Sequence, residues 1–430
     1  MAESTPGPIP DGTIVLHIGP HKTGTTTLQK AFHQNRPALA EQRIHYAGSK
    51  SQPMQAAMAA ASGAKLATAG GDVGTQAWER LLEAVHGSPA RIRVVSSEFF
   101  ADARDSRIPV IIDELGRAQT RVVITLRPLV RIVPSQWQQY MQNRAAMNYD
   151  DDLDYEGWLE QMLADEPPRG VTPSFWRRHR HDRLVERWVA AVGADRVTVI
   201  VVDDSDRRML LDTFEELLAL VPGTLEPREE SFNRSLTVPE ISLVRAFNKE
   251  FVDRGWDVAD YTSYLRFGAV RHLLARRAAP DAARLATPEW AVERICALAA
   301  EMTERIRATG VTVIGDPRLL ADPTLAGPVG ENAWTDEVPA ETVARLMVGF
   351  LQVALDTQPG PAAEGRKPGR IEQGVRTQRM AEEIRRLREK IAAVTTEGAR
   401  SPRLADASRL QVARALAGRV RRRLRQRLRR

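Results

Sequence analysis

Cysteine is nearly absent from this chain. Its 430 residues contain one cysteine, Cys296, which excludes a disulfide framework and favours a reducing compartment. Long apolar runs are also missing, so we expect no membrane-spanning helix. The first residues have neither the basic nor the apolar stretch of a signal peptide, and we therefore expect a cytoplasmic location.

Lysine is scarce as well, and the basic residues are unevenly distributed. The chain has 7 lysines against 54 arginines. Of its 61 basic and 55 acidic residues, 21 basic and 7 acidic ones fall within residues 361–430. The net charge of +6 therefore comes from the C-terminal tail, while the body is acidic. We expect no specific binding of nucleic acid by that body.

A short segment containing two glycines is the most informative part of the sequence. The apolar run 13–18 predicts a buried strand, and residues 28–32 have the pattern of a helix. Between them stands Gly19-Pro20-His21-Lys22-Thr23-Gly24-Thr25-Thr26-Thr27. A strand, a tight glycine loop and a helix N-terminus form an anion site, because loop amides converge there and the helix dipole adds positive potential. The segment predicts a site for a phosphate-bearing nucleotide.

The position of the lysine distinguishes two kinds of phosphate loop. In a Walker A loop the lysine directly follows the second glycine, but here Thr25 has that place and Lys22 precedes Gly24 by two residues. We find no convincing magnesium carboxylate on a following strand. Residues 22–26 instead resemble the loop P-K-[ST]-G-T-[TS] of the sulfotransferases that use 3′-phosphoadenosine-5′-phosphosulfate (PAPS), with His21 replacing the usual proline.

A second segment adds to this resemblance. The β-branched run 121–126 predicts a buried parallel strand that leads into Arg127 and, eight residues later, Ser135. In the sulfotransferases, an arginine and a serine at this separation hold the 3′-phosphate of PAPS. A phosphate monoester suits one fixed guanidinium and one neutral donor. The resemblance therefore implies a cofactor site made of Lys22, Thr23, Gly24, Thr25, Thr26, Thr27, Arg127 and Ser135.

The resemblance covers about residues 12–252 and fades beyond them. The helical stretch ending at Trp188, the join 193–196 and the apolar run 197–202 are similar to the bacterial and membrane-type branch of the family, as is the segment 231–235. Two family features are missing. Thr27 replaces the tryptophan that stacks on adenine in the cytosolic branch, and the R-K-G-x-x-G loop is absent. The adenine contacts and a second 3′-phosphate contact therefore stay unassigned.

The resemblance also implies the chemistry. Sulfuryl transfer depends mainly on positioning and on electrostatic stabilisation, and we expect Lys22 to neutralise charge on the leaving bisphosphate. The family carries its general base after the strand predicted at residues 92–96, as histidine in cytosolic enzymes and often glutamate in carbohydrate enzymes. Glu98 has this place, and His21 is the alternative base. No metal is required.

We predict an α/β fold, a three-layer P-loop-like domain with a central parallel sheet followed by helical C-terminal additions. The expected divisions are a flexible N-terminus (1–11), the α/β core (12–252), a helical continuation of the catalytic domain (253–357), a linker (358–374), a short coiled coil (375–396) and a basic amphipathic tail (403–430).

Residues 144–180 interrupt the alternation of strands and helices. In the family this position carries the acceptor-binding segment, and Trp158, Phe175 and Trp176 as surface aromatics suit a sugar-like acceptor. An insertion with its own small core explains these residues equally well. We expect His179 and His181, which flank an arginine, to face solvent.

The C-terminal tail carries two apolar patterns. A short heptad seam at residues 380–394 predicts at most a weak homo-oligomer. Further along, an i, i+4 apolar stripe at residues 412–428 is surrounded by arginines, which is typical of a helix lying on an anionic membrane surface. A solvated tail, or one that binds nucleic acid non-specifically, explains this composition equally well.

Taken with the resemblance, these patterns predict a cytoplasmic sulfotransferase, peripheral at the inner face of the membrane. It would transfer a sulfuryl group from PAPS to a hydroxyl of a carbohydrate or envelope glycan. Two other classes stay open. One is a P-loop kinase, which would bind ATP with magnesium, and the other is a non-catalytic module that binds anions or glycans.

Overall fold

The computed structural model describes residues 7–63, 67–68, 71–147, 153–165, 174–226, 234–278, 282–335 and 337–357. The chain forms two compact units, and nearly all described residues belong to the larger one, residues 1–66 and 72–364. The linker, the predicted coiled coil and the basic tail, residues 358–430, lie outside the described residues, as do residues 1–6 and 231–233.

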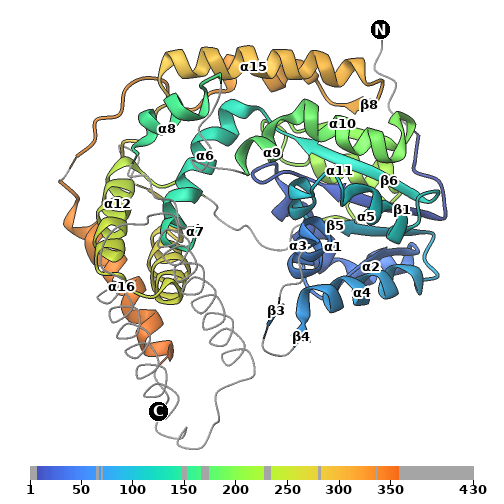
Figure 1. Ribbon diagram of the computed structural model, residues 1–430, viewed down its shortest axis with the longest axis horizontal. Helices are drawn as coiled ribbons and strands as arrows, with labels where there is room; N and C mark the ends of the chain where they lie inside the picture. The colour runs from blue at the N-terminus through green and yellow to red at the C-terminus, as the bar shows by residue number, and fades with distance from the viewer. Residues whose placement is uncertain are drawn as a thin grey trace, which may run out of the picture. The chain divides into compact units, whose positions relative to one another are not determined.

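A six-stranded sheet forms the centre of the larger unit. The strand order is β2-β5-β1-β6-β7-β8, and every neighbouring pair is parallel (Figure 1). The strands are β1 (Thr13–Ile18), β2 (Ile44–Tyr46), β5 (Ile92–Ser96), β6 (Thr120–Leu126), β7 (Val197–Val201) and β8 (Thr312–Ile314). Separately, β3 (Ala67–Thr68) and β4 (Gly71–Asp72) form a two-stranded sheet. The four central strands, β5, β1, β6 and β7, lie where the apolar runs predicted them, because runs buried on both faces have a clear β-branched pattern.

Helices cover both faces of this sheet. Along β1, Ile14 and Leu16 point into one hydrophobic core while Val15 points into another. The first core is completed by α3 (Met54–Ser62), α4 (Val73–His86), α5 (Ile108–Leu115) and α10 (His181–Val192). The second is completed by α1 (Thr25–Gln34), α2 (Arg36–Glu41) and α11 (Met209–Leu217). The predicted three-layer α/β arrangement is confirmed.

A third core is almost entirely helical. Its contributors are α6 (Leu129–Gln142), α8 (Tyr155–Met162), α9 (Phe175–His179), α12 (Val238–Asp253), the π-helix η3 (Tyr261–Val270), α14 (Arg271–Leu274), α15 (Glu289–Ala308) and α16 (Ala340–Thr357). The remaining helices are the short α7 (Arg144–Met147) and α13 (Val258–Asp260) and the 3₁₀ turns η1 (Glu98–Asp102), η2 (Ala194–Arg196), η4 (Pro317–Ala321) and η5 (Pro323–Leu325). Figure 1 shows α6 leading from β6 toward α8, α12 and α16. The described residues of the stretch 253–357 are mainly helical, and this stretch also supplies the edge strand β8.

The insertion of residues 144–180 differs from the expectation of surface aromatics. Trp158 and Phe175 are 4% and 1% exposed and pack in the helical core, with 5.7 Å between their rings. His179 and His181 were expected to face solvent, and this is wrong, because both are buried. The described parts of the insertion therefore contribute their aromatic side chains to the helical core.

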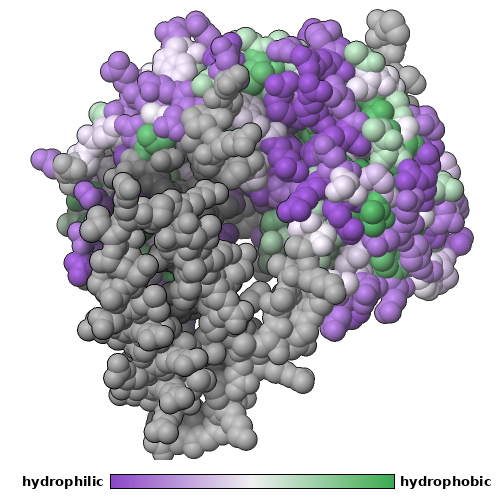
Figure 2. Space-filling model, in the orientation of Figure 1, coloured by the Kyte–Doolittle hydropathy of each residue, from purple (hydrophilic) through white to green (hydrophobic). Residues whose placement is uncertain are grey.

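Exposed apolar side chains are scattered over the described part, and α16 exposes a group of them, Met347, Val348, Leu351 and Leu355. The face of the α/β part seen in Figure 2 is mainly hydrophilic, with scattered apolar residues. None of the helices that the structure describes has the length and apolar character needed to span a membrane.

Candidate active site

The predicted phosphate loop lies between β1 and α1, at the carboxyl edge of the parallel sheet. Lys22 and Gly24 both have left-handed backbone conformations, with φ of 73° and 83°. Gly24 is the N-cap of α1, and no side chain caps this helix. The amides of Gly24, Thr25 and Thr26 have no backbone or side-chain acceptor among the described residues. An uncapped helix start with free amides is suited to an anion.

Gly19 follows β1 directly, where a side chain has no room. A Cβ atom there would lie 2.0 Å from Thr25 Cγ2, 2.4 Å from Thr125 Oγ1 and 2.9 Å from Thr23 Oγ1. Thr23 is fully buried, and its hydroxyl donates to the Pro20 carbonyl at 2.8 Å and lies 3.1 Å from Thr125 Oγ1. The Thr23 hydroxyl thus serves the shape of the loop, whereas Thr26 and Thr27 are exposed in the first turn of α1.

Arg127 joins the loop to the neighbouring strand ends. It follows β6, and its Nη1 donates to the Lys22 carbonyl oxygen at 3.2 Å. Its Nε and Nη2 lie 2.8 and 2.6 Å from Asp204 Oδ2, just beyond β7. The structure therefore brings Arg127 to the phosphate loop, as the motif predicted, and adds Asp204, which the motifs did not mark. Ser135 is half-buried in the second turn of α6, the helix that begins two residues after Arg127.

The Lys22 ammonium lies among other cations. Burial, together with the charges of Arg127 and Arg266, lowers the pKa of Lys22 to about 8. Arg266 is a half-buried residue of η3, and its guanidinium lies 4.8 Å from the Phe267 ring centroid. No ion pair within the described residues uses Arg266. Because like charges repel, this group of cations favours an anionic ligand.

Arg266 is a site residue that the sequence did not reveal. It lies beyond residue 252, where the resemblance fades, and an arginine in a chain with 54 of them carries no signal of its own. A helix with i→i+5 hydrogen bonds is rare and is often found at functional sites, but its presence cannot be read from residue spacing.

Glu98 begins the 3₁₀ turn η1 after β5, and two amide side chains hold it. Gln29 Nε2, from α1, donates to Glu98 Oε2 at 3.2 Å and to Ser96 Oγ at 3.3 Å. Gln52 Nε2 also donates to Glu98 Oε2. Both amides use the same carboxylate oxygen, which leaves Oε1 without a hydrogen-bond partner among the residues that the structure describes. The helix that begins at the phosphate loop therefore also orients the candidate base.

His21, the alternative base, has a different environment. Its ring packs edge-on against Phe99 at 5.2 Å between centroids, and its buried Nε2 has no hydrogen-bond partner. Burial, with the charges of Arg178 and Lys22, holds the pKa of His21 well below its usual range. The imidazole is therefore neutral at pH 7 and a weaker base than an ordinary histidine.

Metal ligands do not converge in the described part of the chain, where no group of three or more His, Cys, Asp or Glu residues is arranged around a common point. His17, in the strand that precedes the loop, forms hydrogen bonds with Ser96 Oγ at 2.8 Å and with Thr125 Oγ1 at 3.3 Å. Burial lowers the pKa of His17 to about 3, so it stays neutral.

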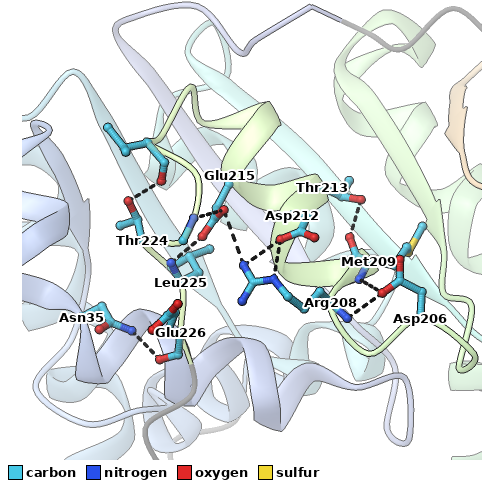
Figure 3. Close-up of polar contacts among 12 residues, drawn as sticks. Asn35, Asp206, Arg208, Met209, Asp212, Thr213, Glu215, Thr224, Leu225 and Glu226 are labelled. Atoms are coloured by element: carbon cyan, nitrogen blue, oxygen red, sulfur yellow. Dashed lines mark hydrogen bonds and ion pairs between the residues drawn. The ribbon is translucent and has the colours of Figure 1, made fainter.

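An open hollow of about 570 Å³ lies beside α11 (Figure 3). Arg208, Asp212 and Glu215 in its lining bond to one another or to the backbone. Arg208 pairs with Asp212 at 2.7 Å, and Glu215 accepts from the amides of Gly223 at 2.8 Å and Leu225 at 2.5 Å. These contacts fix the segment after α11, and we assign no ligand to the hollow.

Comparisons with known proteins find similarity to solved structures. Neither a protein-family model nor a curated protein sequence matches this chain. The chain is similar to the crystal structure of a sulfotransferase from Alicyclobacillus acidocaldarius, with a TM-score of 0.34 and 14% identity, over 57% of this chain and 97% of that one. A similarity at this level assigns no activity, so the function of this chain rests on its own residues and their geometry.

Proposed function

We propose that this chain is a sulfotransferase that moves the sulfuryl group of PAPS to a hydroxyl of an acceptor, with carbohydrate as the acceptor class. One observation carries the proposal. An uncapped helix start with the cations Lys22, Arg127 and Arg266 is joined through Gln29 to the oriented carboxylate Glu98. This arrangement suits an anionic donor beside a hydroxyl that must lose a proton.

The residues at the loop fit a nucleotide with phosphate at both the 3′ and 5′ positions. In the proposal, Arg127 and Ser135 bind the 3′-phosphate, while the free amides of Gly24 to Thr26 and the exposed hydroxyls of Thr26 and Thr27 bind the 5′-phosphate. PAPS would supply the activated sulfuryl group. Lys22 neutralises the charge that develops on the leaving bisphosphate.

Glu98 is the proposed general base. Gln29 and Gln52 fix its Oε2, so that Oε1 is free to accept the proton of the acceptor hydroxyl. His21 is the less suitable base because its lowered pKa leaves it little basicity. Glutamate at this place is often found in carbohydrate enzymes of the family, which supports the acceptor class.

Calorimetry with adenosine 3′,5′-bisphosphate, the product nucleotide, tests the proposal. Since the loop lacks the Walker lysine, we expect equal affinity in EDTA and in magnesium. Arg127→Ala should weaken bisphosphate binding strongly and leave binding of 5′-AMP, which lacks the 3′-phosphate, nearly unchanged. Arg254→Ala, at an exposed arginine paired with Glu250, is the matched control. A strict magnesium requirement, or preference for ATP with magnesium, would contradict the proposal and favour a kinase.

A further inference from the structure

Three histidines with unsatisfied ring nitrogens meet beside the candidate base. His179 is 0% exposed and His181 is 2% exposed, with 6.2 Å between their ring centroids. Both ring nitrogens of His179, Nε2 of His181 and Nε2 of His21 are buried without a hydrogen-bond partner. His21 is close enough to His179 for its charge to affect the pKa of His179. The three come from the phosphate loop, α9 and α10.

A strong ion pair fixes this group next to Glu98. Arg178, the neighbour of His179 on α9, donates from Nε and Nη2 to the two carboxylate oxygens of Asp102 at 2.5 and 2.7 Å. Asp102 is the last residue of η1, the turn that Glu98 begins. The His21 ring lies against Phe99 in the same turn. Both imidazoles thus border the turn that carries the base.

Unpartnered buried nitrogens at this spot require an explanation. Buried polar groups in folded proteins are nearly always hydrogen-bonded, because an unsatisfied one loses its bonds to water without replacement. Burial keeps the pKa of each of the three histidines low, so all are neutral at pH 7. A neutral imidazole offers one N–H donor and one nitrogen acceptor, which matches a hydroxyl group rather than an anion. The cations that suit an anion are at the loop instead.

We propose that His21 and His179 form the inner wall of the acceptor subsite, where their ring nitrogens bind hydroxyls that neighbour the reacting one on a polyhydroxylated, sugar-like acceptor. The inference rests on the sulfotransferase function proposed above and adds the residues that recognise the acceptor. His179 is closed off in this structure, so acceptor binding requires the Arg178–Asp102 ion pair to separate and α9 to move away from the loop.

The first test separates a ligand-binding histidine from a structural one. His179→Phe keeps a ring of similar shape against Phe175 and removes both unsatisfied nitrogens. We expect a higher melting temperature than that of the unmodified protein, and an unchanged dissociation constant for adenosine 3′,5′-bisphosphate. His179→Leu repeats the test with a smaller side chain, in case phenylalanine is too large. Lower melting temperatures for both variants would show that the imidazole serves the fold, and would overturn the inference.

The second test observes the ring nitrogens directly. In protein labelled with ¹⁵N-histidine and saturated with the bisphosphate, methyl glucoside is added up to molar concentration as the polyhydroxyl probe. We expect shifts at the ring nitrogens of His21 and His179, and none at the exposed His86. No shift, or equal shifts at all three, would overturn the inference. A protein that binds the bisphosphate but shows no such shift refutes the subsite alone, whereas failure to bind the bisphosphate refutes the proposed function.

Discussion

Lys22 combines an unusual backbone with an unusual charge environment. Its φ of 73° lies in the left-handed region, which a lysine adopts only when surrounding structure enforces it. Arg127 holds the Lys22 carbonyl, and burial, together with the charges of Arg127 and Arg266, lowers the pKa of the Lys22 ammonium to about 8. The charged form of the Lys22 side chain is therefore unfavourable in the free protein, and a bound anion would stabilise it. This is expected of a group that acts on the charge of a ligand.

The lowered pKa makes nucleotide binding depend on pH. Below about pH 8 the Lys22 ammonium is charged in the free protein, and above it the charge is progressively lost. An anion restores the charge, so binding above pH 8 takes up a proton. We expect the dissociation constant of the bisphosphate to rise with pH above 8, by up to about tenfold per pH unit, the limit for one linked proton. Titration calorimetry between pH 7 and 9.5 measures this slope.

The control for this prediction is Lys22→Arg, because a guanidinium stays charged throughout that range. Its affinity, whatever its absolute value, should not vary with pH above 8. An identical slope in both proteins would assign the titration to another group.

Lys22→Ala should in addition lower turnover by about 10²–10³, the effect of removing one charge-stabilising donor. Lys249→Ala, at an exposed lysine of α12, should leave turnover unchanged.

Glu98→Gln distinguishes the two candidate bases. Glutamine keeps the shape of the side chain but cannot take a proton, so turnover should collapse while bisphosphate affinity is retained. Product formation from PAPS and calorimetry on the same preparation give the two values. Glu83→Gln, on the exposed face of α4, is the matched control. Near-normal turnover of Glu98→Gln would transfer the role of base to His21.

At the scale of elements, the β1–loop–α1 unit depends on close approach of the backbone to side chains. Gly19 passes within contact distance of threonines from the loop, from α1 and from β6. The same helix reaches Glu98 through Gln29. One rigid unit therefore sets both the anion site and the orientation of the carboxylate.

Gly19→Ala tests how far the site depends on this contact. The added Cβ would collide with Thr25 and Thr125, so we expect a loss of about 1–3 kcal/mol in the free energy of unfolding, together with weaker bisphosphate binding. Gly327→Ala, where a Cβ meets nothing within 4 Å, should change neither. Urea unfolding and calorimetry measure the two effects. Unchanged stability of Gly19→Ala would mean that the loop has more freedom than the contacts indicate.

At the scale of the whole molecule, charge divides the chain into an acidic body and a strongly basic C-terminal tail. The tail lies outside the described residues, and its apolar stripe at residues 412–428 is known from sequence alone. A basic amphipathic helix on an anionic membrane would bring the enzyme to a lipid-linked or nascent envelope glycan.

Truncation after Pro361 tests the role of the tail. We expect the full chain to sediment with phosphatidylserine-containing liposomes at low salt, and the truncated chain to stay in solution while keeping its affinity for the bisphosphate. High salt should release the full chain, because the attraction is electrostatic. Binding of the truncated protein to the liposomes, or failure of the full chain to bind them, would show that the tail is not an anchor.

The sequence by itself determined the sheet and the phosphate loop. Runs such as 13–18 and 121–126 are apolar at most of their consecutive positions because both faces of a parallel strand are buried, and this requirement leaves a local pattern. The glycine and lysine spacing of the loop is equally local, since a turn is set by adjacent residues. Arg127 was found for the same reason, as the residue directly after a predicted strand.

Only the tertiary structure decided which side chains meet at the site. Gln29, Arg266 and His179 reach it from α1, η3 and α9, and their roles depend on how helices distant in sequence pack. Exposure also depended on packing, because His179 and His181 flank an arginine in sequence and yet, like Trp158 and Phe175, are enclosed by neighbouring elements. Contacts between elements that are distant in sequence leave no periodic pattern in a single chain, so they can be identified only in the tertiary structure.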